Sequence, residues 1–313
     1  MAVEFHRAVR VTLGAVLLVD FDSSRPTATR QRGLDLSFRV DRASAPGPQR
    51  STLTVLGLSA STRDLLSRVV AEAREQSYAT AQALRSACVQ IYAGRPGQTG
   101  LLADDWILDA PVHRRQGADW STELVCQDGR LPWADAFIAE TTSTVTDPAA
   151  IARAQQKALG LLGEGAEALD FDPQLLAEHF GQVSGGVVSF GPPRSNAQTL
   201  QALGRVPIFQ RGKIQWTRPD VTQLVPAFRL VEGVTALSIS PPGAYGWRTV
   251  RAILNPLLEL GRQVFLRTRD GRDHGPYRVS DVTYTGGTYG PEWYADLTLR
   301  PTAGGAALAE VIG

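Results

Sequence analysis

Lysine and cysteine are nearly absent from this chain of 313 residues, and both shortages narrow what the protein can be. Only Lys157 and Lys213 are lysines among the 32 basic residues, a bias toward arginine that suits interfaces and that a GC-rich coding sequence explains equally well. Two cysteines, Cys88 and Cys126, are too few for a disulfide framework. We expect each to be a small buried side chain in a strand, and the chain to fold in a reducing compartment. The formal net charge is only +1, which gives no overall electrostatic reason to bind nucleic acid or anionic lipid.

Long apolar runs are also missing, because no stretch reaches the length of a membrane span. Near the N-terminus, Arg7 and Arg10 precede an apolar run over 11–19, the order found in a signal peptide. Acidic residues lie on both sides of that run and no A-x-A cleavage site follows it. We therefore expect an N-terminal strand pair and no membrane anchor.

Catalytic signatures are absent as well. The sequence contains no P-loop, G-x-S-x-G, H-E-x-x-H or paired C-x-x-C motif, and Ser59 lacks the closing glycine of a nucleophile elbow. We expect no catalytic residue, no metal site and no cofactor, since the four histidines are scattered at His6, His113, His179 and His274.

Two carboxylate pairs keep one enzymatic alternative open, because a glycoside hydrolase needs two carboxylates beside a sugar cleft. The first pair, Asp104 and Asp105, precedes an apolar strand and is typical of a turn. The second pair is Asp170 and Asp172, of which Asp172 is expected to cap a helix. These structural roles are favoured over a hydrolase.

What the sequence does contain is alternation of apolar and polar residues, most clearly in 226–301. Three runs with a period of two, over 264–268, 277–282 and 293–300, predict strands with one buried face each. Asp270-Gly271 separates the first two runs, and Gly286-Gly287 follows the second. Both pairs supply the positive φ of tight reversals, so the pattern predicts a three-stranded antiparallel meander.

The first 145 residues predict a second β module. Alternating residues over 9–13, 34–40 and 52–56 predict strands, and Ser61 is a plausible cap for a helix inserted at about 61–86. Two further strands are expected, ending near Gly94 and running from Trp120 to Cys126. The basic cluster at 113–115 is expected in a solvated loop.

Between these modules, residues 146–222 predict an α+β module. Asp147-Pro148, Asp172-Pro173 and Ser195 are typical helix starts, and the runs 206–210 and 213–217 predict a hairpin. The fold class expected is thus β-rich α+β, with tube-like antiparallel β-barrel or sheet modules at 1–145 and 223–313 flanking the module at 146–222.

Three groups of motif residues, in the expected order along nearly the whole chain, resemble the baseplate hub proteins of phage tails. The first group is L-S-x-x-T-R, here Leu58, Ser59, Thr62 and Arg63, followed by D-W-x-T and D-G with Trp120, Asp128 and Gly129. The second is the hairpin at 206–217 that follows a helix. The third is L-N-P and the meander, with the motif positions Asn255, Pro256, Gly261, Gly271, Tyr277 and Trp293.

The resemblance implies a structural virion protein rather than an enzyme. It implies a homotrimeric hub, built in the host cytoplasm, that joins the tail tube to a central spike or tip and lines the channel through which DNA leaves. Tail tube and distal tail proteins, the spike or tip protein and the tape measure protein are the partners it implies, with DNA in transit. A cell-wall hydrolase of the tail and a distal tail or tube ring subunit remain alternatives.

The tyrosines of the meander have two interpretations. Tyr284, Tyr289 and Tyr294 could form a sugar-binding face, or they could anchor an interface or a cross-strand pair. The interface is favoured.

Overall fold

The computed structural model describes two β-rich parts of the chain and several short strands between them. Its described residues are 6–25, 34–44, 49–75, 87–108, 112–116, 119–128, 138–142, 165–166, 187–191, 206–210, 213–217, 227–302 and 311–312. The helices predicted after Asp147, Asp172 and Ser195, and Gly129 of the D-G motif, lie outside these residues.

The described residues of the N-terminal part form eight strands and one helix. These are β1 (Ala8–Leu13), β2 (Val16–Asp22), β3 (Asp35–Ala43), β4 (Arg50–Leu56), α1 (Ala60–Glu75), β5 (Cys88–Arg95), β6 (Gln98–Ile107), β7 (Val112–Gln116) and β8 (Asp119–Gln127). The predicted N-terminal strand pair is confirmed, since β1 and β2 form an antiparallel hairpin. The cap of α1 differs from the prediction: Ser59 Oγ, not Ser61, accepts the N–H of Thr62 at 3.1 Å, because the helix begins at Ala60.

The C-terminal part contains the predicted meander. Its elements are β14 (Ala227–Val231), β15 (Ala236–Ile239), η1 (Ala244–Gly246), β16 (Arg248–Ile253), β17 (Gln263–Arg267), β18 (Asp273–Gly287), β19 (Trp293–Pro301) and β20 (Val311–Ile312). Strands β17, β18 and β19 pair antiparallel in that order, as predicted. The second reversal was misplaced. Gly286 and Gly287 are the last residues of β18 and pair with neighbouring strands, and the chain turns back only after them.

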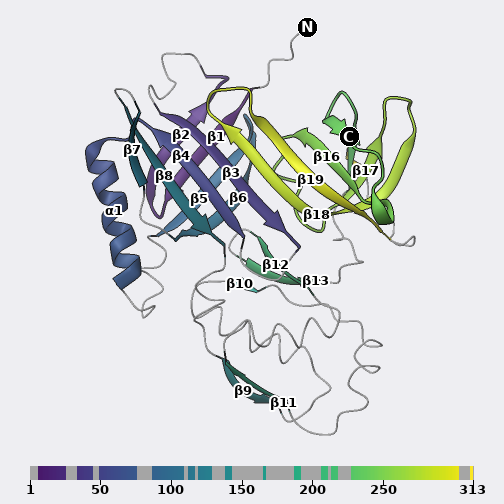
Figure 1. The fold of residues 1–313 in the computed structure, drawn as a ribbon. Coiled ribbons are helices and arrows are strands. Elements are labelled where there is room, and N and C mark those ends of the chain that lie inside the picture. The colour runs from purple at the N-terminus through teal and green to yellow at the C-terminus, as the bar shows by residue number, and fades with distance from the viewer. Residues whose placement is uncertain are drawn as a thin grey trace.

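Five short strands are described from the middle of the chain, and they lie below the large sheet in Figure 1, beyond one end of its strands. They are β9 (Ile138–Thr142), β10 (Gly165–Ala166), β11 (Val187–Gly191), β12 (Val206–Gln210) and β13 (Lys213–Thr217). The predicted hairpin is confirmed by the antiparallel pairing of β12 with β13.

Strands of the N- and C-terminal parts join in one sheet of 15 strands. Its main path runs β15-β16-β19-β18-β3-β4-β8-β6-β5-β1-β2, so β18 pairs with β3 across more than 200 residues of sequence. The prediction of a β-rich fold is confirmed. Among the described strands this sheet is open at both ends. Closure of each module into a barrel stays a prediction, as do the boundaries near residues 145 and 222.

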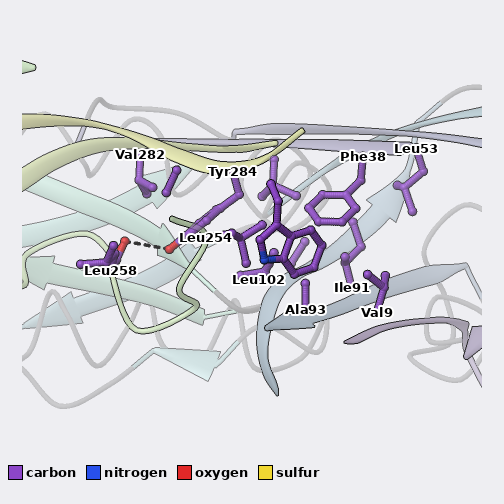
Figure 2. Close-up of a cluster of buried hydrophobic side chains, with 14 of the residues drawn as sticks. Val9, Phe38, Leu53, Ile91, Ala93, Leu102, Leu254, Leu258, Val282 and Tyr284 are labelled. Carbon is purple, nitrogen blue, oxygen red and sulfur yellow. Dashed lines mark hydrogen bonds between the residues drawn. The ribbon is translucent and has the colours of Figure 1, made fainter. Parts of the chain in front are cut away.

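The core lies between two layers of this folded sheet. Phe38 and Leu53 point down from β3 and β4 toward Val9, Ile91 and Ala93 on β1 and β5 (Figure 2). The same cluster continues to Leu254, Leu258 and Tyr284 of the C-terminal part (Figure 2). Because one face of β3, β4 and β18 packs into this core, only the opposite face is available to water or a partner.

The turn between β17 and β18 yields a testable prediction. Gly271 has φ +78°, and its N–H donates to the carbonyl oxygen of Thr268 at 2.9 Å. A Cβ at this position would meet no atom within 4 Å, so only the backbone conformation opposes a side chain. We expect Gly271→Val to lower the free energy of unfolding by about 1–2 kcal/mol in chemical denaturation, and Gly271→Asn to cost less. Equal stability of wild type and Gly271→Val would show that the turn does not need this conformation.

Candidate functional site

Eight strands of the large sheet form a continuous antiparallel surface, in the order β15-β16-β19-β18-β3-β4-β8-β7. On β3, β4 and β19, in the stretch 281–285 of β18 and in most of β8 and β16, buried residues alternate with exposed or half-buried ones, so the latter share the side away from the core. The register places Ser238 of β15 beside Arg251 and Arg114 of β7 beside Ser121, on the same side. We call this side the polar face. Its described members are Asp35, Ser37, Arg39, Asp41, Arg50, Thr52, Thr54, Arg114, Glu123, Val125, Gln127, Ser238, Thr249, Arg251, Asp281, Thr283, Thr285, Tyr294, Asp296, Thr298 and Arg300.

Charges on the polar face balance. Its described side chains include five carboxylates, on Asp35, Asp41, Glu123, Asp281 and Asp296, and five guanidinium groups, on Arg39, Arg50, Arg114, Arg251 and Arg300. A groove of about 500 Å³ runs along the β15, β16, β18 and β19 portion of this face. The surface is therefore hydrophilic and hollowed without being strongly charged.

At the centre of the polar face, arginines are held by aspartates on the same or the neighbouring strand. Arg251 donates from two nitrogens to the two carboxylate oxygens of Asp296, at 2.7 and 2.9 Å. Arg39 Nε donates to both carboxylate oxygens of Asp41 at 3.1 Å, and Thr283 Oγ1 donates to Asp41 at 2.7 Å. The hydrogen bonds to Asp41 and Asp296 raise the pKa of Arg39 and of Arg251, respectively.

Tyr294 joins these two ion pairs into one cluster. The guanidinium of Arg251 lies 4.1 Å from the centre of the Tyr294 ring, and Tyr294 pairs with Thr285 on β18, which in turn pairs with Arg39 on β3. The cluster thus crosses the junction where the C-terminal strands meet the N-terminal strands.

Both ends of the eight-stranded surface are free edges within the described part of the chain. At one end β15 pairs with β16, apart from a single bridge between Ala236 and Glu232. At the other end β7 pairs with β8. Leu237 on β15 is 51% exposed. Unpaired strand edges present N–H and C=O groups that can pair with another chain.

The two halves of this surface repeat the same strand order. From its free edge, the C-terminal half has a hairpin β15-β16, then β19, then β18. From the β18 junction, the N-terminal half has a hairpin β3-β4, then β8, then β7. In both halves the third strand along the sequence comes last in the sheet order, after the fourth. The β18–β3 junction therefore joins the last strand of one repeat to the first strand of the other.

Behind the polar face, a buried ion pair ties the two layers of the N-terminal part together. Arg42 of β3 donates to Asp105 of β6 at 2.7 Å, and Ser51 of β4 also donates to Asp105. Burial lowers the pKa of Arg42, but the carboxylates of Asp105 and Asp128 outweigh it and raise that pKa overall. Cys126 is buried beside this group, and burial raises the pKa of its thiol well above the usual value.

This ion pair overturns the prediction for Asp104 and Asp105. Both lie inside β6 rather than in a turn, and they alternate, so Asp105 points into the core while Asp104 is half-buried on the other side. They do not face one cleft together, as a hydrolase pair would require. Asp172 lies outside the described residues.

Two of the family motifs meet at the start of α1. Leu58 is buried, the Oγ atoms of Ser59 and Thr62 lie 2.8 Å apart, and Arg63 donates to the carbonyl oxygen of Leu58. The Arg63 guanidinium lies 5.1 Å from the centre of the Trp120 ring. These residues join β4, α1 and β8 into one corner.

The remaining motif residues hold the C-terminal part. The Asn255 side chain accepts the N–H of Leu257 at 3.0 Å, and a Cβ on Gly100 would lie 2.7 Å from Pro256. Gly261 donates its N–H to Val279, and the Tyr277 hydroxyl accepts from Arg248 at 3.0 Å. Trp293 is buried, in edge-to-face contact with Phe38.

Two sequence interpretations were wrong. Tyr284 is buried, and its hydroxyl donates to the carbonyl oxygen of Leu258 (Figure 2), so Tyr284, Tyr289 and Tyr294 do not share a face. The 113–115 cluster lies in β7 rather than in a loop. His113 Nδ1 lies 3.1 Å from Thr122 Oγ1 of β8, and its Nε2 lies 3.4 Å from Ser67 Oγ of α1, so this side of β7 faces α1.

The described residues give no sign of a metal centre or a membrane span. Among them, no group of three or more His, Cys, Asp or Glu side chains is placed to hold a metal ion. No described helix combines the length and the apolar composition needed to cross a bilayer.

Comparison with known proteins finds similar folds among solved structures. No family model and no curated protein matches the chain. Among solved structures, the 43 kDa tail protein of prophage MuSo2 from Shewanella oneidensis is similar, with a TM-score of 0.58. It shares 9% sequence identity, over 94% of this chain and 97% of that protein.

The chain has the fold of phage tail proteins. A tail protein from Neisseria meningitidis MC58 is also similar, with a TM-score of 0.55 and 9% identity over 94% of this chain and 96% of that one. Both similarities extend over nearly the full length of each chain.

Proposed function

We propose that three copies of this chain form the baseplate hub of a phage tail, or of a related tail-like particle, with the polar face lining its channel. The observation that carries the proposal is the repeated strand order of the eight-stranded surface. Two repeats in each chain give six repeats in three chains, which matches the quasi-sixfold ring that the resemblance implies.

The β18–β3 junction supports a specific way of closing the ring. Within the chain, the last strand of one repeat pairs with the first strand of the other through seven residue pairs. The equivalent junction between chains is β7 of one copy with β15 of the next. The eight strands of the surface alternate in direction, so the first strand, β15, and the last, β7, point in opposite directions. In a ring, β7 of one copy therefore meets β15 of the next antiparallel, as β18 meets β3.

The direction in which the sheet faces follows from its packing. Its apolar side is covered by the second layer of the core, so only the polar face can line a water-filled channel. In this assembly the middle strands β9–β13 lie toward one end of the ring. We propose that this end meets the spike or tip protein, and that the opposite end, which carries exposed Trp120 and Tyr289, meets tail tube or distal tail proteins.

The free edge of β15 gives a test of ring closure. Leu237→Lys places a charged side chain on this edge, which is how natural edge strands avoid pairing, while the position is exposed within the single chain. We expect the wild type to have the mass of three chains in native mass spectrometry and Leu237→Lys to be monomeric, with an unchanged melting temperature. Leu257→Lys, at a site of similar exposure away from both edges, is the matched control and should remain trimeric.

Two results would contradict the proposal. One is a wild type that stays monomeric at concentrations at which tail proteins assemble. The other is a Leu237→Lys variant that assembles like Leu257→Lys, which would show that β15 is not part of the junction.

A further inference from the structure

The ion pairs at the centre of the polar face make several hydrogen bonds each, although they lie at an exposed surface. Arg251 and Asp296 make a two-point contact, and Asp41 accepts from both Arg39 and Thr283. The side chains of all four charged residues are 40–61% exposed. Exposed ion pairs contribute little to the stability of a fold, so stability alone does not account for this arrangement.

The other effect of this arrangement is the removal of free positive charge from the centre of the wall. A guanidinium group is an excellent ligand for phosphate, since it can donate two parallel hydrogen bonds. DNA binds proteins largely through such contacts, and each one adds to the affinity and to its dependence on salt. In Arg39 and Arg251 these donors are turned toward carboxylates on the same wall, and the Arg300 guanidinium lies 4.1 Å from the centre of the Trp247 ring.

We propose that Asp41 and Asp296 keep Arg39 and Arg251 from the phosphates of duplex DNA, so that the wall passes DNA without retaining it. This inference rests on the proposed function, because it takes the polar face as the channel wall. It adds a role for four named residues: the carboxylates act as internal competitors of the DNA backbone. Arginines on this face can then serve the packing of the wall and the Tyr294 contact without holding the cargo.

Removing the two carboxylates tests the idea. Asp41→Asn with Asp296→Asn frees two guanidinium groups in each chain, or six in three chains. Binding of a fluorescently labelled, blunt-ended linear duplex is measured by anisotropy over a series of salt concentrations. We expect weak binding by the wild type and at least about tenfold tighter binding by the double variant at low salt, with the slope of log K against log salt steeper by up to about 5.

Two controls separate this effect from a simple change of net charge. Asp270→Asn with Asp273→Asn makes the same charge change outside the polar face, and it also frees Arg272, whose Nε lies 3.1 Å from Asp270. Because that guanidinium lies away from the wall, DNA binding should gain clearly less than in the Asp41→Asn, Asp296→Asn variant. Adding Arg39→Gln and Arg251→Gln to the Asp41 and Asp296 changes should return binding to the wild-type level. Native mass of every variant is recorded, so loss of assembly is seen separately from a change in DNA binding.

Two outcomes would overturn the inference. One is a wild type that already binds the duplex as tightly, and with as steep a salt dependence, as the Asp41→Asn, Asp296→Asn variant. The other is a gain in affinity no larger than that of the Asp270→Asn, Asp273→Asn control. A monomeric wild type would count against the ring, whereas either of these results in a trimeric protein would count against the paired carboxylates alone.

Discussion

Replacing Asp105 with alanine is expected to lower the free energy of unfolding by about 3–5 kcal/mol, because it leaves the guanidinium of Arg42 charged and buried without its partner. Both side chains are at most 2% exposed, and their closest atoms lie 2.7 Å apart. Ser51 also loses the acceptor for its hydroxyl. Chemical denaturation followed by circular dichroism measures the change.

Asp104→Asn is the matched control, since it alters the next carboxylate of the same strand. Burial raises the pKa of Asp104, so its folded pKa lies above its unfolded value. Ionisation of Asp104 therefore opposes folding as the pH rises through these values, and Asp104→Asn should leave stability at neutral pH unchanged or raise it. The apolar pair Arg42→Met with Asp105→Leu should recover most of the loss. A loss in Asp104→Asn as large as in Asp105→Ala would contradict this account of the ion pair.

Trp293→Ala has the other large expected effect, again about 3–5 kcal/mol of lost stability. Trp293 is only 6% exposed, its ring contacts Phe38 edge-to-face at 6.3 Å, and Arg7 lies 5.3 Å from the ring centre. The contact joins β19 of the C-terminal part to β3 of the N-terminal part, so the loss should affect the whole unfolding transition. Thermal and chemical melts of the purified chain measure it.

Trp247→Ala makes the same chemical change at a site that is 39% exposed. Its expected cost is about 1 kcal/mol, mainly the contact with Arg300. A Trp293→Ala variant that melts like the wild type would show that this contact does not stabilise the junction of the two parts.

Alternation predicted the strands of both outer parts because it is a local property. The meander, the N-terminal hairpin and the burial of Trp293 all follow from a period of two and from turn residues. The error at Gly286-Gly287 has a tertiary cause: a Cβ on Gly286 would lie 2.6 Å from Phe38, so this glycine serves close packing, not reversal.

The candidate site could not be predicted in the same way, because it depends on which strands are neighbours. Arg251 meets Asp296 only through the β16–β19 register, and Arg39 approaches the C-terminal strands only through the β18–β3 junction. A local signal did exist for the buried ion pair. Arg42 continues the apolar alternation of Leu36, Phe38 and Val40, which marks a charged side chain pointing into the core.

The most direct test of the ring is an electron-microscopy reconstruction of tail particles in which this chain is identified by mass spectrometry. The account predicts a threefold density at the tail tip in which β7 of one copy pairs antiparallel with β15 of the next, and the polar face lines the channel. A sixfold ring of this chain would contradict the hub and favour a tube or distal tail subunit. Absence of the chain from the particles would contradict any structural role in the tail.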